Sequence, residues 1–113
     1  METITTDQLR EMKDKQQDLA LVDVLEPDSF KQFHLPGAIN VPVGEDFEEE
    51  IQKAVPDKDK PVVVYCSDEE CLASRKAARV MDRLGYEKVY DYDGGKKAWQ
   101  EAGLSVVAGA SSG

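Results

Sequence analysis

Short runs of apolar, β-branched residues most constrain what this chain can fold into. Residues 62–64 are three consecutive valines, and residues 20–22 form a second apolar run. Runs of this length and composition are typical of strands that are covered on both faces. Segments with apolar residues at helical spacing, such as Phe47, Ile51 and Val55, lie between such runs. We therefore predict an α/β fold with a central, mainly parallel sheet of about five short strands and helices on both faces.

The same patterns place the individual elements along the chain. Strands are expected at residues 20–25, 39–42, 62–65 and 88–92, and residues 104–107 either add a short edge strand or pack against the sheet. Helices are expected at residues 5–13, from Pro27 onward, and at residues 44–55, 75–84 and 96–102. Thr5 or Thr6 is expected to cap the first helix, and Gly85 to end the fourth. Ser74 is expected either to cap the fourth helix or to donate a hydrogen bond to a sulfur bound at Cys66.

Length and charge exclude several classes of protein. The 113 residues suit one domain, which we place at residues 1–108, with a disordered tail at residues 109–113. The formal net charge is -9, from 14 Lys and Arg against 23 Asp and Glu, which argues against nucleic acid or an anionic membrane as a partner. No leader peptide and no apolar run of membrane-spanning length is visible. We therefore expect a soluble, cytoplasmic monomer in which the two cysteines are free thiols.

One of these cysteines, Cys66, stands directly after the valine-rich run and before a polar loop that leads into a helix. Ligands of such sheets bind beyond the carboxyl ends of the strands, and a helix N-terminus lowers the pKa of a nearby thiol. The backbone amides of residues 67–74 are expected to curl around the sulfur and hold an anion. The alternative is a small buried apolar residue, but the position at the ligand-binding edge favours a reactive thiol.

Four stretches together resemble a single-domain rhodanese: Leu21-Val22-Asp23-Val24, then His34-Leu35-Pro36-Gly37-Ala38-Ile39-Asn40-Val41-Pro42, then Val64-Tyr65-Cys66, then Asp93-Gly94-Gly95 with Trp99. The resemblance covers nearly the whole chain. It implies a sulfurtransferase or sulfur carrier in which Cys66 takes a sulfane sulfur from thiosulfate or a protein persulfide. The resulting persulfide would pass that sulfur to cyanide or to a thiol of a partner. No cofactor and no metal are expected, because two cysteines and one histidine do not make a four-ligand zinc set.

The loop after Cys66 is expected to bind the substrate, through Ser67, Asp68, Glu69, Glu70, Cys71, Ser74 and Arg75. Cys71 is a candidate resolving thiol because the loop between the two cysteines is short; the alternative is a small residue that packs inward. Many relatives carry a glycine in this loop and an arginine at the position of Leu25. Here the three loop carboxylates are expected to repel thiosulfate and to raise the thiol pKa. A neutral or cationic donor, or a protein-bound persulfide, therefore fits better.

Other conspicuous residues are interpreted as structural. His34 is expected in a turn that packs the sheet, Asp23 is expected to accept backbone hydrogen bonds, and Trp99 is expected in the core. Gly94 and Gly95 are expected to form a tight turn with close backbone approach.

Two other functions remain open from the sequence. A thiol-based redox or arsenate reductase-like enzyme would use both cysteines. A non-catalytic interaction or sensory module would use the acidic loop as its docking surface. A phosphatase is less favoured, because its loop ends in an arginine that forks onto the oxyanion, and Arg75 comes too late in this loop.

Overall fold

A computed structural model describes residues 1–16 and 18–109 of the protein. Within these residues the chain forms five strands and five helices, in the order β1 (Glu2–Ile4), α1 (Thr6–Lys15), β2 (Ala20–Asp23), α2 (Pro27–Gln32), β3 (Ile39–Asn40), α3 (Phe47–Ala54), β4 (Val62–Tyr65), α4 (Ala73–Arg83), β5 (Val89–Tyr92) and α5 (Gly95–Glu101). The strands form one sheet in the order β1-β5-β4-β2-β3, and every neighbouring pair is parallel. The predicted fold class is confirmed.

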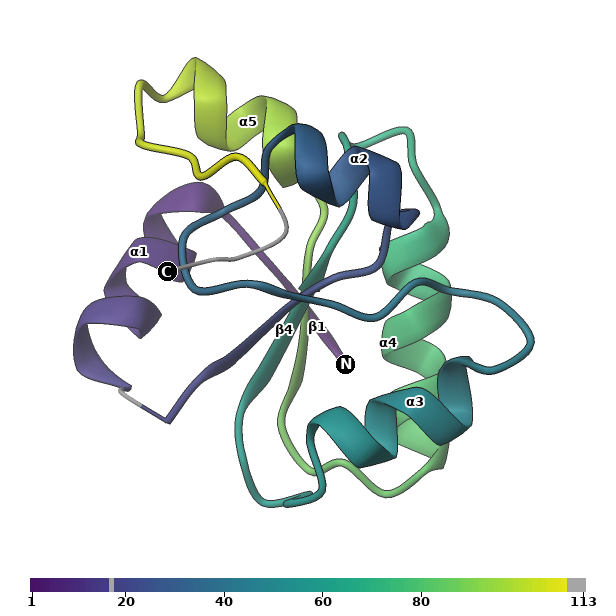
Figure 1. Ribbon diagram of the computed structural model, residues 1–113. Coiled ribbons are helices and arrows are strands. Elements are labelled where there is room, and N and C mark those ends of the chain that lie inside the picture. The colour runs from purple at the N-terminus through teal and green to yellow at the C-terminus, as the bar shows by residue number, and fades with distance from the viewer. Residues whose placement is uncertain (17, 110–113) are drawn as a thin grey trace.

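The sheet separates two apolar layers, and alternate residues of each strand enter opposite layers. Val22 and Val64 belong to the layer under α3 and α4, whereas Leu21 and Val63 belong to the layer under α1, α2 and α5. Figure 1 shows α1 and α5 on one side of the sheet and α3 and α4 on the other. Both faces of the central strands are therefore covered, which explains why their sequence is apolar without a break.

Two features lie at the edges of the fold, and the first of them differs from the sequence-based expectation. Strand β1 was not predicted, because it has only three residues, two of them exposed; its pairing with β5 supplies the hydrogen bonds that make it a strand. The segment 104–107 packs against the core through Leu104 and Val106, and Val107 forms an isolated antiparallel bridge with His34. The packed alternative for this segment is thus correct.

The helix ends follow the predicted caps in two of three cases. Thr5 caps α1 in a capping box with Gln8, and Gly85, with φ of 95°, follows the end of α4. The predicted N-cap role of Ser74 is wrong: α4 begins at Ala73, its N-cap is Leu72, and Ser74 is buried in the first helical turn.

The predicted tail begins at Gly109, which donates to the carbonyl of Lys31; residues 110–113 lie outside the described residues.

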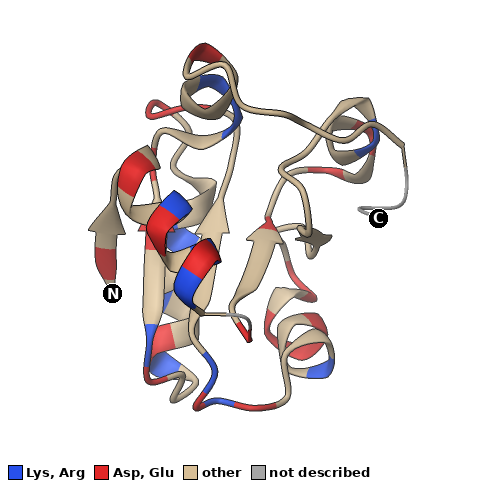
Figure 2. Cartoon of the chain, turned by 90° about the vertical axis from the view of Figure 1, so that its left-hand side faces the viewer, with Lys and Arg blue, Asp and Glu red and all other residues tan. Residues whose placement is uncertain are grey.

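Charged residues gather on the helices and turns, while the strands carry few of them (Figure 2). Among the described residues, no helix has the length and apolar character needed to cross a membrane. The charges of strands β2 and β5 belong to Asp23 and Asp91, and both of these carboxyl groups are buried. Because a buried carboxyl group is costly, each of them needs a local explanation.

Candidate active site

The carboxyl ends of the parallel strands meet at one edge of the sheet, and Cys66 lies there directly after β4. Asp23 at the end of β2 is paired in register with Tyr65, and Tyr65 is paired with Tyr92 at the end of β5. The segment after β2, the loop after β4 and the turn before α5 therefore border the same site. This is the edge at which the sequence predicted a ligand to bind.

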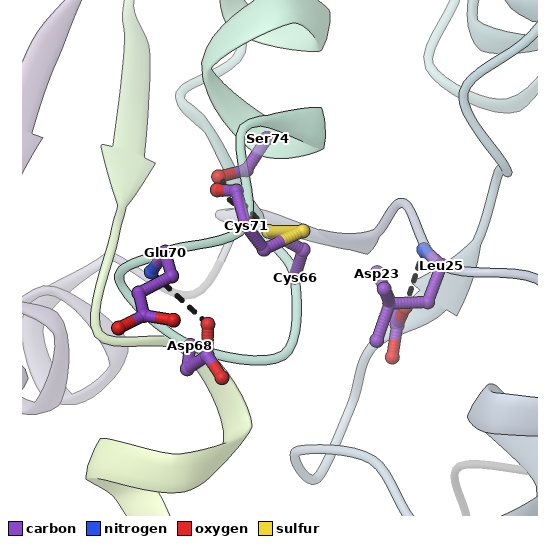
Figure 3. Close-up of a disulfide and its surroundings, with 7 residues drawn as sticks. All are labelled: Asp23, Leu25, Cys66, Asp68, Glu70, Cys71 and Ser74. Carbon is purple, nitrogen blue, oxygen red and sulfur yellow. Dashed lines mark hydrogen bonds between the residues drawn. A yellow bond between two sulfur atoms is a disulfide. The ribbon is translucent and has the colours of Figure 1, made fainter.

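Cys66 and Cys71 are joined by a disulfide across the loop (Figure 3). The expectation of two free thiols is therefore wrong for the form described here. Their Cα atoms are 6.3 Å apart, which lies within the range for a disulfide, so the short loop can close without moving its ends. Cys66 is 1% exposed and belongs to the apolar layer under α4. The sulfur thus lies at the inner wall of the site and not at the surface.

The loop satisfies its own backbone amides instead of directing them to the sulfur. Glu70 N donates to Asp68 Oδ1 at 3.0 Å, and Cys71 N donates to the carbonyl of Asp68 at 3.2 Å. The atoms near Cys66 Sγ are the carbonyl oxygen of Cys71, at 3.3 Å, and Ser74 Oγ, at 3.6 Å. In the disulfide state no backbone amide of the described residues donates a hydrogen bond to Cys66 Sγ, and two amides of the loop are bonded to Asp68 instead.

The first turn of α5 holds the start of this loop. Lys96 N donates to the carbonyl of Cys66 at 3.0 Å, and Lys97 N donates to the carbonyl of Ser67 at 2.9 Å. Gly95 has φ of 62°, and a Cβ atom at this position would collide with the carbonyl group of Cys66. The predicted close backbone approach at the Gly94-Gly95 turn is confirmed, and its reason is contact with the cysteine residue itself.

A buried lysine lies beside this contact. The Lys96 side chain donates to the carbonyl of Ser29 at 2.6 Å and lies 3.9 Å from Asp23 Oδ2. Burial lowers the pKa of Lys96 and raises that of Asp23, although each charge partly favours the other. Asp23 Oδ1 also accepts a 2.9 Å hydrogen bond from Leu25 N, as predicted. Lys96 therefore places a positive charge near the position where the sequence has Leu25.

Of the other predicted site residues, the three loop carboxylates lie together and Arg75 lies apart from them. Asp68, Glu69 and Glu70 line a pocket together with Gly94, Lys97, Ala98 and Glu101, so the three carboxylates gather between the loop and the start of α5, in a pocket whose lining does not include Cys66. Arg75 is exposed on α4, on the helix that leads away from the loop.

Two of the residues interpreted as structural are confirmed in that role, and one residue was missed. His34 is buried against the ring of Phe30, and Trp99 is a core residue. Asp91 was missed: it is 1% exposed and lies on the same layer as Cys66. The signal that could have found it is a carboxyl group two residues after Val89 on an alternating strand, which places both on one face.

Comparisons with known proteins agree with this geometry. The family model described as a rhodanese-like domain matches residues 5–102. The thiosulfate sulfurtransferase GlpE of Coxiella burnetii is 31% identical over 86 residues, which cover 76% of this chain and 76% of GlpE. An HTH-type transcriptional regulator of Mycobacterium tuberculosis is 34% identical over 96 residues, 85% of this chain. A thiosulfate sulfurtransferase structure from Pseudomonas aeruginosa matches 96% of this chain, with 37% identity and a TM-score of 0.83.

The chain belongs to the rhodanese-like domain family, because the family model spans most of its length. It covers 41% of the Mycobacterium tuberculosis regulator and 20% of the Pseudomonas aeruginosa chain. The same domain is therefore found both as most of a small protein and as one part of larger ones.

Proposed function

We propose that this protein is a rhodanese-type sulfurtransferase or sulfur carrier that holds a sulfane sulfur as a persulfide on Cys66. The observation that carries the proposal is the place of Cys66: it follows β4 at the ligand-binding edge, and α4 begins after a short loop. The name of the relative GlpE, a thiosulfate sulfurtransferase that this chain matches over most of its length, supports the same chemistry.

The proposed reaction has two displacements at sulfur. The Cys66 thiolate attacks the outer sulfur of the donor, and the donor's S–S bond breaks with its electron pair on the leaving group, which is sulfite when the donor is thiosulfate. The outer sulfur of the persulfide is then attacked by cyanide or an acceptor thiolate. The persulfide S–S bond breaks, and the Cys66 thiolate is restored.

Cys71 offers a second fate for the persulfide. Its thiolate can attack Cys66 Sγ, displace the outer sulfur as hydrosulfide, and close the disulfide between the two cysteines. The support for this step is the short loop, whose two ends already sit at disulfide distance. An external dithiol would then be needed to return the protein to its reduced form. We therefore expect oxidised protein to take up no sulfur until a reductant has been added and removed.

The charges around the mouth bear on the choice of donor and partner. Asp68, Glu69 and Glu70 disfavour a small dianion, while Lys96 is engaged by Asp23 and the Ser29 carbonyl. A protein persulfide, or a neutral or cationic donor, is accordingly the favoured donor. The acceptor would be cyanide or a protein thiol, in a cytoplasmic setting where thiols stay reduced, and the net charge of -9 disfavours nucleic acid.

Sulfur uptake by the reduced protein tests the proposal directly. Reduced protein is incubated with thiosulfate, and separately with a protein persulfide, and its intact mass and cyanide-dependent thiocyanate formation are measured. We expect the gain of one sulfur atom, complete loss of uptake in Cys66→Ser, and retained uptake in Cys71→Ser. If neither donor adds sulfur to the reduced protein, or if Cys66→Ser retains full activity, the proposal is wrong.

The disulfide favours a second candidate function, a thiol-based redox or arsenate reductase-like enzyme. In this reading the two cysteines cycle between the disulfide and the dithiol, and sulfur transfer is absent. The two functions are separated by their products: arsenite formation or disulfide turnover without thiocyanate supports the second. A protein with neither activity would be the remaining alternative, an interaction or sensory module.

A further inference from the structure

Two helices fix the ends of the loop that joins the two cysteines. At its start, the first turn of α5 donates hydrogen bonds to the carbonyl groups of Cys66 and Ser67. At its end, the carbonyl of Leu72 accepts a 3.0 Å hydrogen bond from Lys76 N, in the first turn of α4. The conformation of the residues between these two anchors therefore decides where Cys71 lies.

Asp68 holds the middle of this loop (Figure 3). Its Oδ1 atom accepts a hydrogen bond from Glu70 N at 3.0 Å, and its carbonyl oxygen accepts one from Cys71 N at 3.2 Å. A bond from a carboxylate to the amide two residues further on is a common way for aspartate to fix a turn. Asp68 is half-buried, whereas Glu69 is exposed, and within the described part of the chain the Glu69 side chain forms no hydrogen bond or ion pair.

The conformation that Asp68 stabilises is the one in which the two cysteines meet. Their Cα atoms are 6.3 Å apart, and the carbonyl oxygen of Cys71 lies 3.3 Å from Cys66 Sγ. The amides of Glu70 and Cys71 belong to the segment that the sequence predicted to hold an anion at the sulfur, but here both point to Asp68. A loop that turned these amides to the sulfur would have to give up both bonds. Asp68 thus favours the disulfide over such a loop.

We propose that Asp68 is a positioning residue that holds the loop in the conformation in which Cys71 closes the disulfide with Cys66. This rests on the proposed function, in which Cys66 carries a persulfide. In the closing step the Cys71 thiolate attacks Cys66 Sγ, and the S–S bond of the protonated persulfide breaks with its electron pair on the outer sulfur. The outer sulfur is reduced and leaves with its proton as hydrosulfide, while Cys71 is oxidised to the disulfide. Asp68 forms no bond to the reacting atoms and acts only through the loop.

The consequence is that Asp68 sets how the persulfide sulfur is divided between two routes. Attack by Cys71 releases hydrosulfide, whereas attack by an external acceptor on the outer sulfur transfers it. Cys71 competes as an intramolecular nucleophile, so its share depends on its effective concentration beside Cys66. One hydrogen bond that favours the closed loop changes this effective concentration by about three- to ten-fold.

The test is the equilibrium of the disulfide and dithiol forms with reduced and oxidised dithiothreitol at pH 7. Full-length protein is equilibrated, its free thiols are trapped with N-ethylmaleimide, and the two forms are quantified by intact mass. We expect the equilibrium constant for reduction to rise by about three- to ten-fold in Asp68→Ala. It should stay within about two-fold of the unchanged protein in Asp68→Asn, which loses the charge but keeps an acceptor oxygen.

The matched control is Glu69→Ala, one residue further along the same loop. This variant removes a carboxylate that forms no hydrogen bond, so the equilibrium should again stay within about two-fold. An unchanged equilibrium in Asp68→Ala overturns the proposal. An equal shift in Asp68→Asn or in Glu69→Ala overturns it as well, because the charge and not the hydrogen bond would then be responsible.

A second measurement needs no variant. If the bond between Asp68 and Glu70 N favours the disulfide, the disulfide must favour that bond by the same factor. Hydrogen exchange of the Glu70 amide, followed by NMR, should therefore be about three- to ten-fold slower in the oxidised than in the reduced protein. Equal exchange in the two forms overturns the proposal. Neither measurement involves sulfur transfer, so a protein that takes up no sulfur contradicts the proposed function, while the dithiothreitol equilibrium still decides the role of Asp68.

Discussion

The backbone amide of Lys96 donates a 3.0 Å hydrogen bond to the carbonyl oxygen of Cys66. This contact joins the first turn of α5 to the residue on which the proposed chemistry depends. It is possible because Gly95, one residue earlier, has no side chain and adopts φ of 62°. The first turn of α5 therefore determines where the cysteine residue lies after the end of β4.

We expect Gly95→Ala to destabilise the protein by about 3 kcal/mol or more, because the left-handed backbone and a collision with Cys66 both contribute. The control is Gly103→Ala, where φ is 77° but a Cβ atom would have nothing within 4 Å, so that only the backbone cost of about 1–2 kcal/mol applies. Urea unfolding of both variants measures the difference. Equal losses at the two positions would show that the contact with Cys66 is not tight.

Neutralising the loop carboxylates should make Cys66 more reactive. We expect the double variant Glu69→Gln, Glu70→Gln to lower the thiol pKa and to raise alkylation at pH 7 by about two- to five-fold, the modest effect typical of exposed charges. Thiosulfate uptake should rise with it. Glu48→Gln with Glu50→Gln, on α3, makes the same change in net charge and should leave Cys66 unaffected. An unchanged thiol pKa in the loop variant would contradict the repulsion argument.

Asp91 should make the oxidised protein less stable as the pH rises. Burial raises its pKa in the folded state, so the folded protein binds more protons than the unfolded chain between the unfolded and folded pKa values. The free energy of unfolding then falls with rising pH across that window, from about pH 4 upward. We expect Asp91→Asn to remove the part of this decline that Asp91 causes, while Asp23, whose pKa burial also raises, keeps its own part. Denaturant unfolding is measured across pH with the disulfide intact, so that neither cysteine titrates. Parallel pH curves for the two proteins would contradict the prediction.

Asp23 and Lys96 should behave as a coupled pair in spite of their 3.9 Å separation. Removing either charged group leaves its partner buried without an opposite charge. We therefore expect Asp23→Asn and Lys96→Met each to lower the free energy of unfolding by about 2–4 kcal/mol. The double variant should cost less than the two single losses together, by about 1–3 kcal/mol. A double-mutant cycle in urea supplies the four values. Strict additivity would show that Lys96 is held by the Ser29 carbonyl alone.

Much of the fold was readable from local sequence patterns. The apolar runs at residues 20–22 and 62–64 predicted the central strands, and the helical spacing of Phe47, Ile51 and Val55 predicted α3, which begins three residues later than expected. Strand β1 was missed because a three-residue edge strand has no periodicity of its own. Its pairing with β5, at the far end of the chain, makes it a strand.

The site was predicted in part, because only some of its features follow from residues that are neighbours in the sequence. The position of Cys66 at a strand end is a local property, and the chain order alone revealed it. Of the two roles expected for Ser74, the cap is wrong because α4 begins one residue earlier. The other expectation placed its hydroxyl group near the sulfur, and Ser74 Oγ does lie 3.6 Å from Cys66 Sγ.

The sequence by itself determined the class of fold, the candidate nucleophile and the acidic character of its loop, because each follows from neighbouring residues. The tertiary structure alone decided which distant groups meet at this edge: the amide of Lys96 on the carbonyl of Cys66, and the side chain of Lys96 beside Asp23. Packing three parallel strands and two helices at one edge creates these contacts. No pattern along the chain encodes them, because they depend on strand order and not on sequence separation.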